Sequence, residues 1–222
     1  MKISKRLELL SKETVGCNTI VDVGCDHGLF SIYSVLNHGI KHAYLLDINE
    51  EPLNSAKLNC VKYKVTDKVT YLLSDGLIEF KGTLDCLVIS GIGGYLMTKI
   101  LSQSLDKIKQ ANKIVLQPNS DFEVLRKFLF DNGFDIVLEN MILDNDKYCY
   151  YLTAELGQVE YTEEDITFGP LLRHNISTTY SNYWEKKYNA LLKELTNVKD
   201  NSQKIKLENY IEKIKENIIT KR

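Results

Sequence analysis

The chain has 222 residues, of which 44% are hydrophobic and 26% are charged, which indicates a soluble globular protein of one domain plus an appendage. No apolar run approaches the roughly 18–20 residues of a membrane span, and residues 1–6 lack the apolar core of a secretory signal, so we expect no membrane partner. The net charge of −2 neither favours nor excludes nucleic acid. The five cysteines are odd in number and form no Cys-x-x-Cys pair, so they suggest neither a disulfide framework nor a zinc site, and we expect a cytoplasmic protein without a metal.

Short apolar runs alternate with helical stretches through the first 131 residues. A short amphipathic helix at 3–12 comes first, with Leu7 and Leu10 on its apolar face and Lys5 and Arg6 facing outward. The strands that we expect after it are 19–23, 42–47, 69–73, 84–90 and 113–116. We expect four helices between and after these strands: one that ends near residue 37, one at 50–61, one at 95–109 and one that ends near residue 131. This alternation predicts a parallel sheet covered by helices on both faces.

The pattern changes at residue 134. Two strand-like runs, 134–143 and 147–156, are separated only by Asp144, Asn145 and Asp146. So short a connection makes an antiparallel hairpin, because a parallel crossover needs a dozen or more residues. Five parallel strands closed by an antiparallel hairpin are the chain order of class I Rossmann-like methyltransferases, whose sheet is seven-stranded. A dehydrogenase domain has no reason to end in this way.

The last sixty residues read as a separate helical extension. Residues 157–182 form a polar connector, with a short helix expected near 170–174. Apolar residues then recur at helical spacing from Trp184 to Val198 and from Leu207 to Ile218, and residues 199–202 interrupt the pattern. We interpret these as an antiparallel helical hairpin whose Trp184 and Tyr188 belong to the core. The alternative is one continuous coiled coil that dimerises.

The two parts also differ in charge. From residue 183 onward, ten lysines and arginines stand against six aspartates and glutamates, a net charge of +4, so residues 1–182 carry −6. A basic extension can contact phosphates, although solvated helix faces are often rich in lysine too. We therefore expect a catalytic domain at 1–160 and an extension at 161–222, in a protein that acts as a monomer.

A glycine loop follows the first strand, where residues 22–28 read DVGCDHG. Glycine lets the backbone turn sharply and approach a ligand, and the N-terminus of the next helix offers free N–H groups to a carboxylate. Asp47, at the end of the second strand, can accept both ribose hydroxyls, and Asp75, after the third, can accept the adenine amino group of the same ligand. The alternative is that these aspartates only cap helices and turns.

S-adenosylmethionine is the cofactor that this arrangement favours. A dinucleotide would require Gly-x-Gly-x-x-Gly, but Cys25 and Asp26 stand where the second glycine is needed. A carboxylate there would repel a diphosphate, whereas it tolerates a sulfonium and an ammonium group. The predicted cofactor-binding residues are Asp22, Gly24, Cys25, Gly28, Asp47, Ile48, Asp75, Gly76 and Gly91.

Three segments together resemble the bacterial tRNA (adenine(22)-N(1))-methyltransferases. They are residues 21–27 (VDVGCDH), 91–94 (GIGG) and 116–119 (LQPN); residues 3–7, the run 168–170 and the C-terminal hairpin resemble the family as well. The resemblance covers essentially the whole chain, and its most specific element is the Asp26-His27 pair. It implies a Rossmann-like methyltransferase with a coiled-coil extension that methylates N1 of adenosine 22 in tRNA. One departure is Gly28, where relatives often carry alanine.

The expected chemistry agrees with these residues. When N1 of adenine attacks the methyl group, positive charge moves from sulfur to the base, so the enzyme aligns the reactants and stabilises a migrating cation. Asp26 is the first candidate for stabilising that charge, while His27 is either a partner of the base or a structural residue. Asn119 offers a donor and an acceptor to an adenine edge. These three form the predicted catalytic set.

The substrate would lie against the ends of the fourth and fifth strands. The glycines at 91–94 leave room for a flipped base on which Tyr95 could stack, although they could equally serve only to cap the strand. The predicted substrate-binding residues are Lys5, Arg6, Gly93, Gly94, Tyr95, Gln117, Pro118 and Arg173, with the lysines of the last two helices as further contacts to tRNA. Two rival functions stay open at this point: methylation of a small molecule or a protein, and a cofactor-sensing or interaction protein without turnover.

Overall fold

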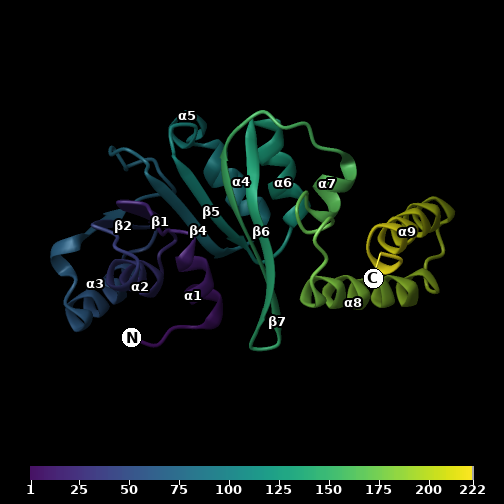
Figure 1. Ribbon diagram of the computed structural model, residues 1–222, viewed down its shortest axis with the longest axis horizontal. Coiled ribbons are helices and arrows are strands. Elements are labelled where there is room, and N and C mark those ends of the chain that lie inside the picture. Colours follow the sequence, from purple (N-terminus) through teal and green to yellow (C-terminus); the bar gives the residue numbers. More distant parts are fainter. Residues whose placement is uncertain (222) are drawn as a thin grey trace.

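Alternate residues of the central strands enter two separate apolar clusters, so the sheet is the middle of three layers (Figure 1). In the computed structural model, which describes residues 1–221, Ile20 and Val88 point to one face of the sheet, while Val21 and Ile89 point to the other. Strands buried on both faces have this pattern in parallel sheets. The predicted α/β class is therefore confirmed.

The strands lie in the order β3-β2-β1-β4-β5-β7-β6. Their bounds are β1 Thr19–Val23, β2 His42–Asp47, β3 Val69–Leu73, β4 Cys86–Ile92, β5 Lys113–Pro118, β6 Phe134–Asp144 and β7 Lys147–Leu156. The first five are parallel, and β7 pairs antiparallel with both β5 and β6. Insertion of β7 between β5 and β6 is the predicted closing hairpin of the methyltransferase sheet.

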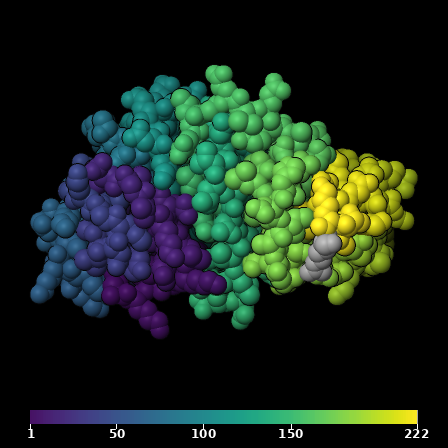
Figure 2. All heavy atoms as spheres, in the orientation of Figure 1, coloured from purple at the N-terminus to yellow at the C-terminus, as the bar shows by residue number. Residues whose placement is uncertain are grey.

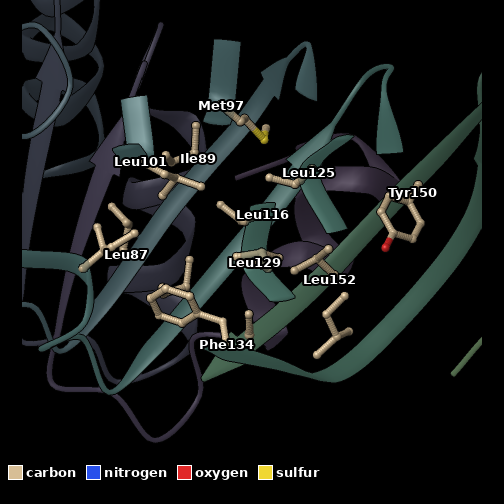
Figure 3. Close-up of a cluster of buried hydrophobic side chains, with 14 of the residues drawn as sticks. Leu87, Ile89, Met97, Leu101, Leu116, Leu125, Leu129, Phe134, Tyr150 and Leu152 are labelled. Atoms are coloured by element: carbon tan, nitrogen blue, oxygen red, sulfur yellow. The ribbon is translucent and has the colours of Figure 1, made fainter. Parts of the chain in front are cut away.

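Helices cover both faces of this sheet and extend beyond it. Their bounds are α1 Lys5–Lys12, α2 Leu29–Asn37, α3 Glu50–Tyr63, η1 Thr66–Lys68, α4 Gly94–Ser102, α5 Leu105–Ile108, α6 Phe122–Asp131, α7 Glu163–Phe168, α8 Thr178–Leu195, α9 Asn201–Ile214 and the π-helical turn η2 Lys215–Ile219. Buried residues of α1, α2 and α3 join one cluster, and those of α4, α5 and α6 join the other. Figure 3 shows part of the second cluster, with side chains from the strands facing those of α4 and α6.

Two expectations about helices were wrong. The helix expected over 95–109 is interrupted at Gln103 and Ser104, where α4 ends and α5 begins. The connector contains its helix at α7 rather than at 170–174, which form a turn. Thr162 and Asp165 make a reciprocal capping box at the start of α7, and Gly169 ends the helix at a positive φ of 91°.

The C-terminal extension is a helical hairpin, which confirms one of the two interpretations of its sequence. The helices α8 and α9 are separated by residues 196–200 and pack against each other, so a single continuous helix is wrong. Figures 1 and 2 show the pair as a lobe at one end of the molecule. Trp184 is 3% exposed and lies in the same apolar cluster as the strands, in agreement with the core role predicted for it.

A buried ion pair attaches the extension to the sheet. The Arg126 guanidinium lies 3.3 Å from the Glu139 carboxylate, and both side chains are at most 3% exposed. Arg126 also donates to the carbonyls of Ile166 and Thr167, and Glu139 accepts from the backbone N–H groups of Leu171 and Leu172. Arg126 is therefore hydrogen-bonded to the last turn of α7, and Glu139 to the segment between α7 and α8. Within residues 1–221 no helix is both long and apolar enough to cross a bilayer.

Candidate active site

The carboxyl ends of β1, β2, β3, β4 and β5 meet at one edge of the sheet, as parallel strands require. The loop after β1 is fixed there by two hydrogen bonds, because the N–H groups of Gly24 and Cys25 both donate to the carbonyl of Leu46 in β2. Gly24, Asp26 and Gly28 all have positive φ angles, of 72°, 50° and 67°. The loop thus turns back on itself before α2 begins. Open α/β sheets bind ligands at the carboxyl ends of their strands.

Gly28 has a packing reason to be glycine in this chain. A Cβ there would lie 2.8 Å from the Leu45 side chain and 3.0 Å from the Ala56 Cβ, so alanine would require β2 or α3 to shift. Gly24, in contrast, has open space where its Cβ would be. Because Gly24 has no side chain, a ligand has room to reach the backbone there.

A cavity of about 300 Å³ opens beside this loop. Its walls come from α1, from the glycine loop and from the end of β4. They are formed by Arg6, Leu7, Asp22, Gly24, Cys25, Asp26, His27, Leu29, Phe30, Ser90, Gly91 and Ile92. We call it the cofactor cavity. The sequence did not predict five of these residues, because nothing in it distinguishes them from other residues of helices and strands: Leu7, Leu29, Phe30, Ser90 and Ile92.

Asp22 is the most perturbed acidic group of the cofactor cavity. Its carboxylate is 4% exposed, and burial raises its pKa from 3.8 to about 6. The Ser31 hydroxyl, which donates to it at 2.6 Å, opposes this shift, while the nearby carboxylates of Asp47 and Asp26 add to it. A cation bound beside Asp22 would relieve both the burial cost and the repulsion.

The other predicted cofactor residues follow β2 and β3 along the same edge. Asp47 is 9% exposed and accepts from the N–H of Asn49, which leaves its second oxygen for a ligand. Its carbonyl also accepts from the N–H of Ser74, so the ends of β2 and β3 are held together. Ile48 is 61% exposed, and Asp75 is exposed as well.

Asp26 and His27 project into solvent at the mouth of the cofactor cavity. Their side chains are 74% and 57% exposed, and His27 Nε2 lies 3.5 Å from Asp26 Oδ1. The backbone of the pair is anchored, since Asn59 of α3 donates to the His27 carbonyl at 2.9 Å. Both groups are accessible to a substrate that approaches the cavity from outside.

Arg6 does not face outward as the sequence predicted, and this expectation was wrong. Its guanidinium turns into the cofactor cavity and donates to Ser90 Oγ at 3.1 Å and to Gln117 Oε1. The Gln117 amide then donates to Asn119 Oδ1 at 3.2 Å, and the Asn119 amide donates to the Gly91 carbonyl at 2.6 Å. These hydrogen bonds orient both amides. They connect α1 to the ends of β4 and β5.

The remaining predicted substrate residues lie in different environments. A Cβ added at Gly94 would lie 2.4 Å from the Asp121 carbonyl, and one added at Gly93 would lie 3.1 Å from the Ser120 hydroxyl. Other residues of the protein therefore fill the space beside both glycines. Beside Gly91, where β4 bulges at a φ of 87°, an added Cβ would have only the Arg6 guanidinium within 4 Å among the described residues 1–221, apart from its chain neighbours.

The other candidates for RNA contact also differ from one another. Lys5 is exposed, Tyr95 is 66% exposed, and Pro118 is buried as the last residue of β5. Arg173 is 14% exposed and is held by Asp165 at 2.8 Å and by the Thr162 hydroxyl, which favours a structural role at the start of α7. Within residues 1–221 no cluster of three or more His, Cys, Asp or Glu side chains could hold a metal.

Comparisons with known proteins agree over nearly the whole chain. A family model described as tRNA (adenine(22)-N(1))-methyltransferase matches residues 20–218. The protein of that name from Bacillus subtilis is 28% identical over 97% of both chains. A Streptococcus pneumoniae protein solved in complex with S-adenosyl-L-methionine superposes with a TM-score of 0.91, at 32% identity over 98% of this chain and all of the other. TrmK from M. capricolum, in complex with S-adenosyl-homocysteine, also gives a TM-score of 0.91, at 27% identity over the full length of both.

Proposed function

The chain belongs to the tRNA (adenine(22)-N(1))-methyltransferase family, and from this membership we infer that it uses S-adenosylmethionine to methylate N1 of adenine 22 in tRNA. The cofactor cavity supports this function best. It brings the buried carboxylate of Asp22 and the exposed carboxylate of Asp26 to one sheet edge, beside the end of β4 at Gly91, which we call the acceptor side. The roles of single residues, argued below, are part of the same proposal.

Three acidic residues suit the three parts of the cofactor. Asp22 lies in the cavity wall and would face the ammonium and sulfonium end, because a cation lowers the free energy of its buried carboxylate. Asp47 would accept the ribose hydroxyls, and the exposed side chains of Ile48 and Asp75 would contact the adenine. Gly24 leaves the backbone open to the methionine carboxylate, next to the first turn of α2.

Methyl transfer requires alignment and charge stabilisation rather than proton removal. S-adenosylmethionine supplies an electrophilic methyl group, and N1 of adenine attacks it with its own lone pair. Asp26 lies at the mouth of the cofactor cavity, where its carboxylate can stabilise positive charge as it passes to the base. His27, 3.5 Å from that carboxylate, can hold it in position or donate to the base.

The acceptor side is held by the hydrogen-bonded series Arg6, Gln117, Asn119 and Gly91. Because Arg6 donates to Gln117 Oε1, the Gln117 amide must point to Asn119, and Asn119 must point its own amide to Gly91. Asn119 then presents a fixed edge to an adenine that enters beside Gly91. We propose that Arg6 acts on the acceptor through this series, and that Lys5 and Tyr95 contact the RNA from outside.

Residues 161–222 would form the tRNA-binding extension of a catalytic domain at 1–160. The extension carries a net charge of +4 from residue 183 onward, and its lysines include exposed ones at 186, 193, 204 and 206. The apolar residues Ile211, Ile214 and Ile218 are buried within the chain, so the hairpin needs no second copy to cover them. This supports action as a monomer.

Nucleoside mass spectrometry tests the proposal directly. The protein is incubated with S-adenosylmethionine and an unmodified tRNA transcript, and with a transcript in which adenine 22 is replaced by guanine. We expect 1-methyladenosine only in the first. Methylation of protein extract but of no tRNA would identify a protein methyltransferase, and cofactor binding without transfer to any unmodified tRNA would identify a sensing protein.

A further inference from the structure

A second cavity lies between the catalytic edge and the extension, and Asn119 is the one residue of its wall that has a role in the proposed reaction. It has a volume of about 430 Å³ and is bounded by the start of α6, by β7 and by α8. We call it the aromatic cavity, and its walls include Asn119, Phe122, Tyr148, Tyr183, Trp184 and Lys187. A pocket of this size suits a small planar ligand.

The aromatic rings of this cavity are neighbours in space although they come from three elements. The Tyr148 and Tyr183 ring centroids are 5.6 Å apart and nearly perpendicular, and those of Phe122 and Tyr183 are 6.1 Å apart. The cavity thus offers the ring surface of three aromatic side chains together.

A cation stands at the side of the same cavity. Lys187 Nζ donates to the Tyr210 hydroxyl at 2.8 Å and lies 4.7 Å from the Trp184 ring centroid. An ammonium group has three donors, so Lys187 keeps N–H groups for an oxygen of a ligand. The Arg126 guanidinium also borders the cavity, but it is occupied by Glu139 and by backbone carbonyls.

The Asn119 side chain links the aromatic cavity to the acceptor side. Asn119 forms part of its wall, while the Asn119 amide donates to the carbonyl of Gly91, which lines the cofactor cavity. A polynucleotide with one nucleotide beside Gly91 therefore has its neighbours within reach of the aromatic cavity. Every nucleobase has a face that can stack on tyrosine or phenylalanine, whatever its identity.

We propose that the aromatic cavity binds an unpaired nucleobase of the tRNA that flanks the methylated adenine, by stacking on Tyr148, with Lys187 beside its phosphate or carbonyl oxygens. This site rests on the proposed function, since the RNA that delivers the base is the substrate. It would hold the strand open while the target adenine is out of its pair, and it would contribute to tRNA affinity rather than to cofactor binding.

Steady-state kinetics with Tyr148→Ala test this site, with Tyr148→Phe and Tyr63→Ala as controls. Stacking of one base predicts a KM for tRNA raised about tenfold in Tyr148→Ala, with kcat at saturating tRNA and the Kd for S-adenosylhomocysteine unchanged. Tyr148→Phe keeps the ring and should stay within about twofold of the parent. Tyr63 lies on α3, on the far side of the sheet, and its replacement should change nothing.

A second measurement does not depend on any variant. Trp184 is the single tryptophan of the chain and lines the aromatic cavity, so its fluorescence reports on occupancy. With S-adenosylhomocysteine saturating, addition of unmodified tRNA transcript should quench the emission. An unchanged emission, or an unchanged KM in Tyr148→Ala, would overturn the site while the wild-type methylation of tRNA persists. Absence of methylation by the wild-type protein would instead reject the proposed function.

Discussion

Replacement of Asp22 by asparagine should stabilise the protein and weaken cofactor binding at the same time. The folded protein holds the pKa of Asp22 at about 6, against 3.8 for the ordinary carboxyl group, mainly because the group is buried. Since this pKa is raised, the folded state binds the proton more tightly than the unfolded state. The stability associated with that proton is complete below pH 3.8 and is lost as the pH rises through 6.

The size of the effect follows from the shift of about two pKa units. One unit corresponds to about 1.4 kcal/mol, so ionised Asp22 destabilises the free protein by about 3 kcal/mol above pH 7. Asparagine can accept the same hydrogen bond from Ser31 without a charge. The free energy of unfolding from urea denaturation should therefore rise in Asp22→Asn relative to the parent by about 1.4 kcal/mol between pH 5 and pH 7.5, because about half of the full difference already develops below pH 5.

Binding should change in the opposite direction. In the parent, affinity for S-adenosylmethionine should rise between pH 5 and 7 as Asp22 ionises, and in Asp22→Asn it should be lower and nearly independent of pH. Asp85 is a suitable control, because hydrogen bonds from Asn112, Thr19 and Asn18 lower its pKa despite its partial burial. Asp85→Asn should lose stability at neutral pH. A variant at Asp22 that is less stable than the parent at pH 7.5, or equal in affinity, would refute the reasoning.

Three further substitutions have defined outcomes. Asp47→Ala should weaken S-adenosylmethionine binding by about ten- to a hundredfold, from the loss of charged hydrogen bonds to the ribose, and calorimetry that finds unchanged affinity would reject the ribose contact. Asp26→Asn should lower kcat at least tenfold while the cofactor Kd changes little; equal kcat in both proteins would remove its role in charge stabilisation. Arg126→Met leaves Glu139 buried without its cation and should cost about 3–5 kcal/mol in urea unfolding. Adding Glu139→Gln should recover part of that loss, and a cost below about 1 kcal/mol would mean that the pair does not anchor the extension.

The sequence by itself determined the order of the strands and predicted the sheet edge at which we propose that the cofactor binds. Alternation of apolar runs with helical stretches is a local property, and the three-residue connection at 144–146 requires an antiparallel pair, so the sheet could be predicted before its contacts were known. Carboxyl ends of parallel strands share one edge, and this alone brought Asp22, Asp47 and Asp75 together. The helical hairpin could also be predicted, because the helical spacing of its apolar residues and the interruption at residues 199–202 are local properties of the sequence.

Only the tertiary structure decided where side chains from distant segments meet. Arg6 and Gln117 are separated by 111 positions, so no periodicity within α1 could show that the guanidinium turns inward rather than to solvent. The cavity that Tyr148 shares with Tyr183 likewise depends on packing between elements. Local patterns determine which face of a helix or strand is apolar, but contacts between elements determine which polar group occupies the space between them.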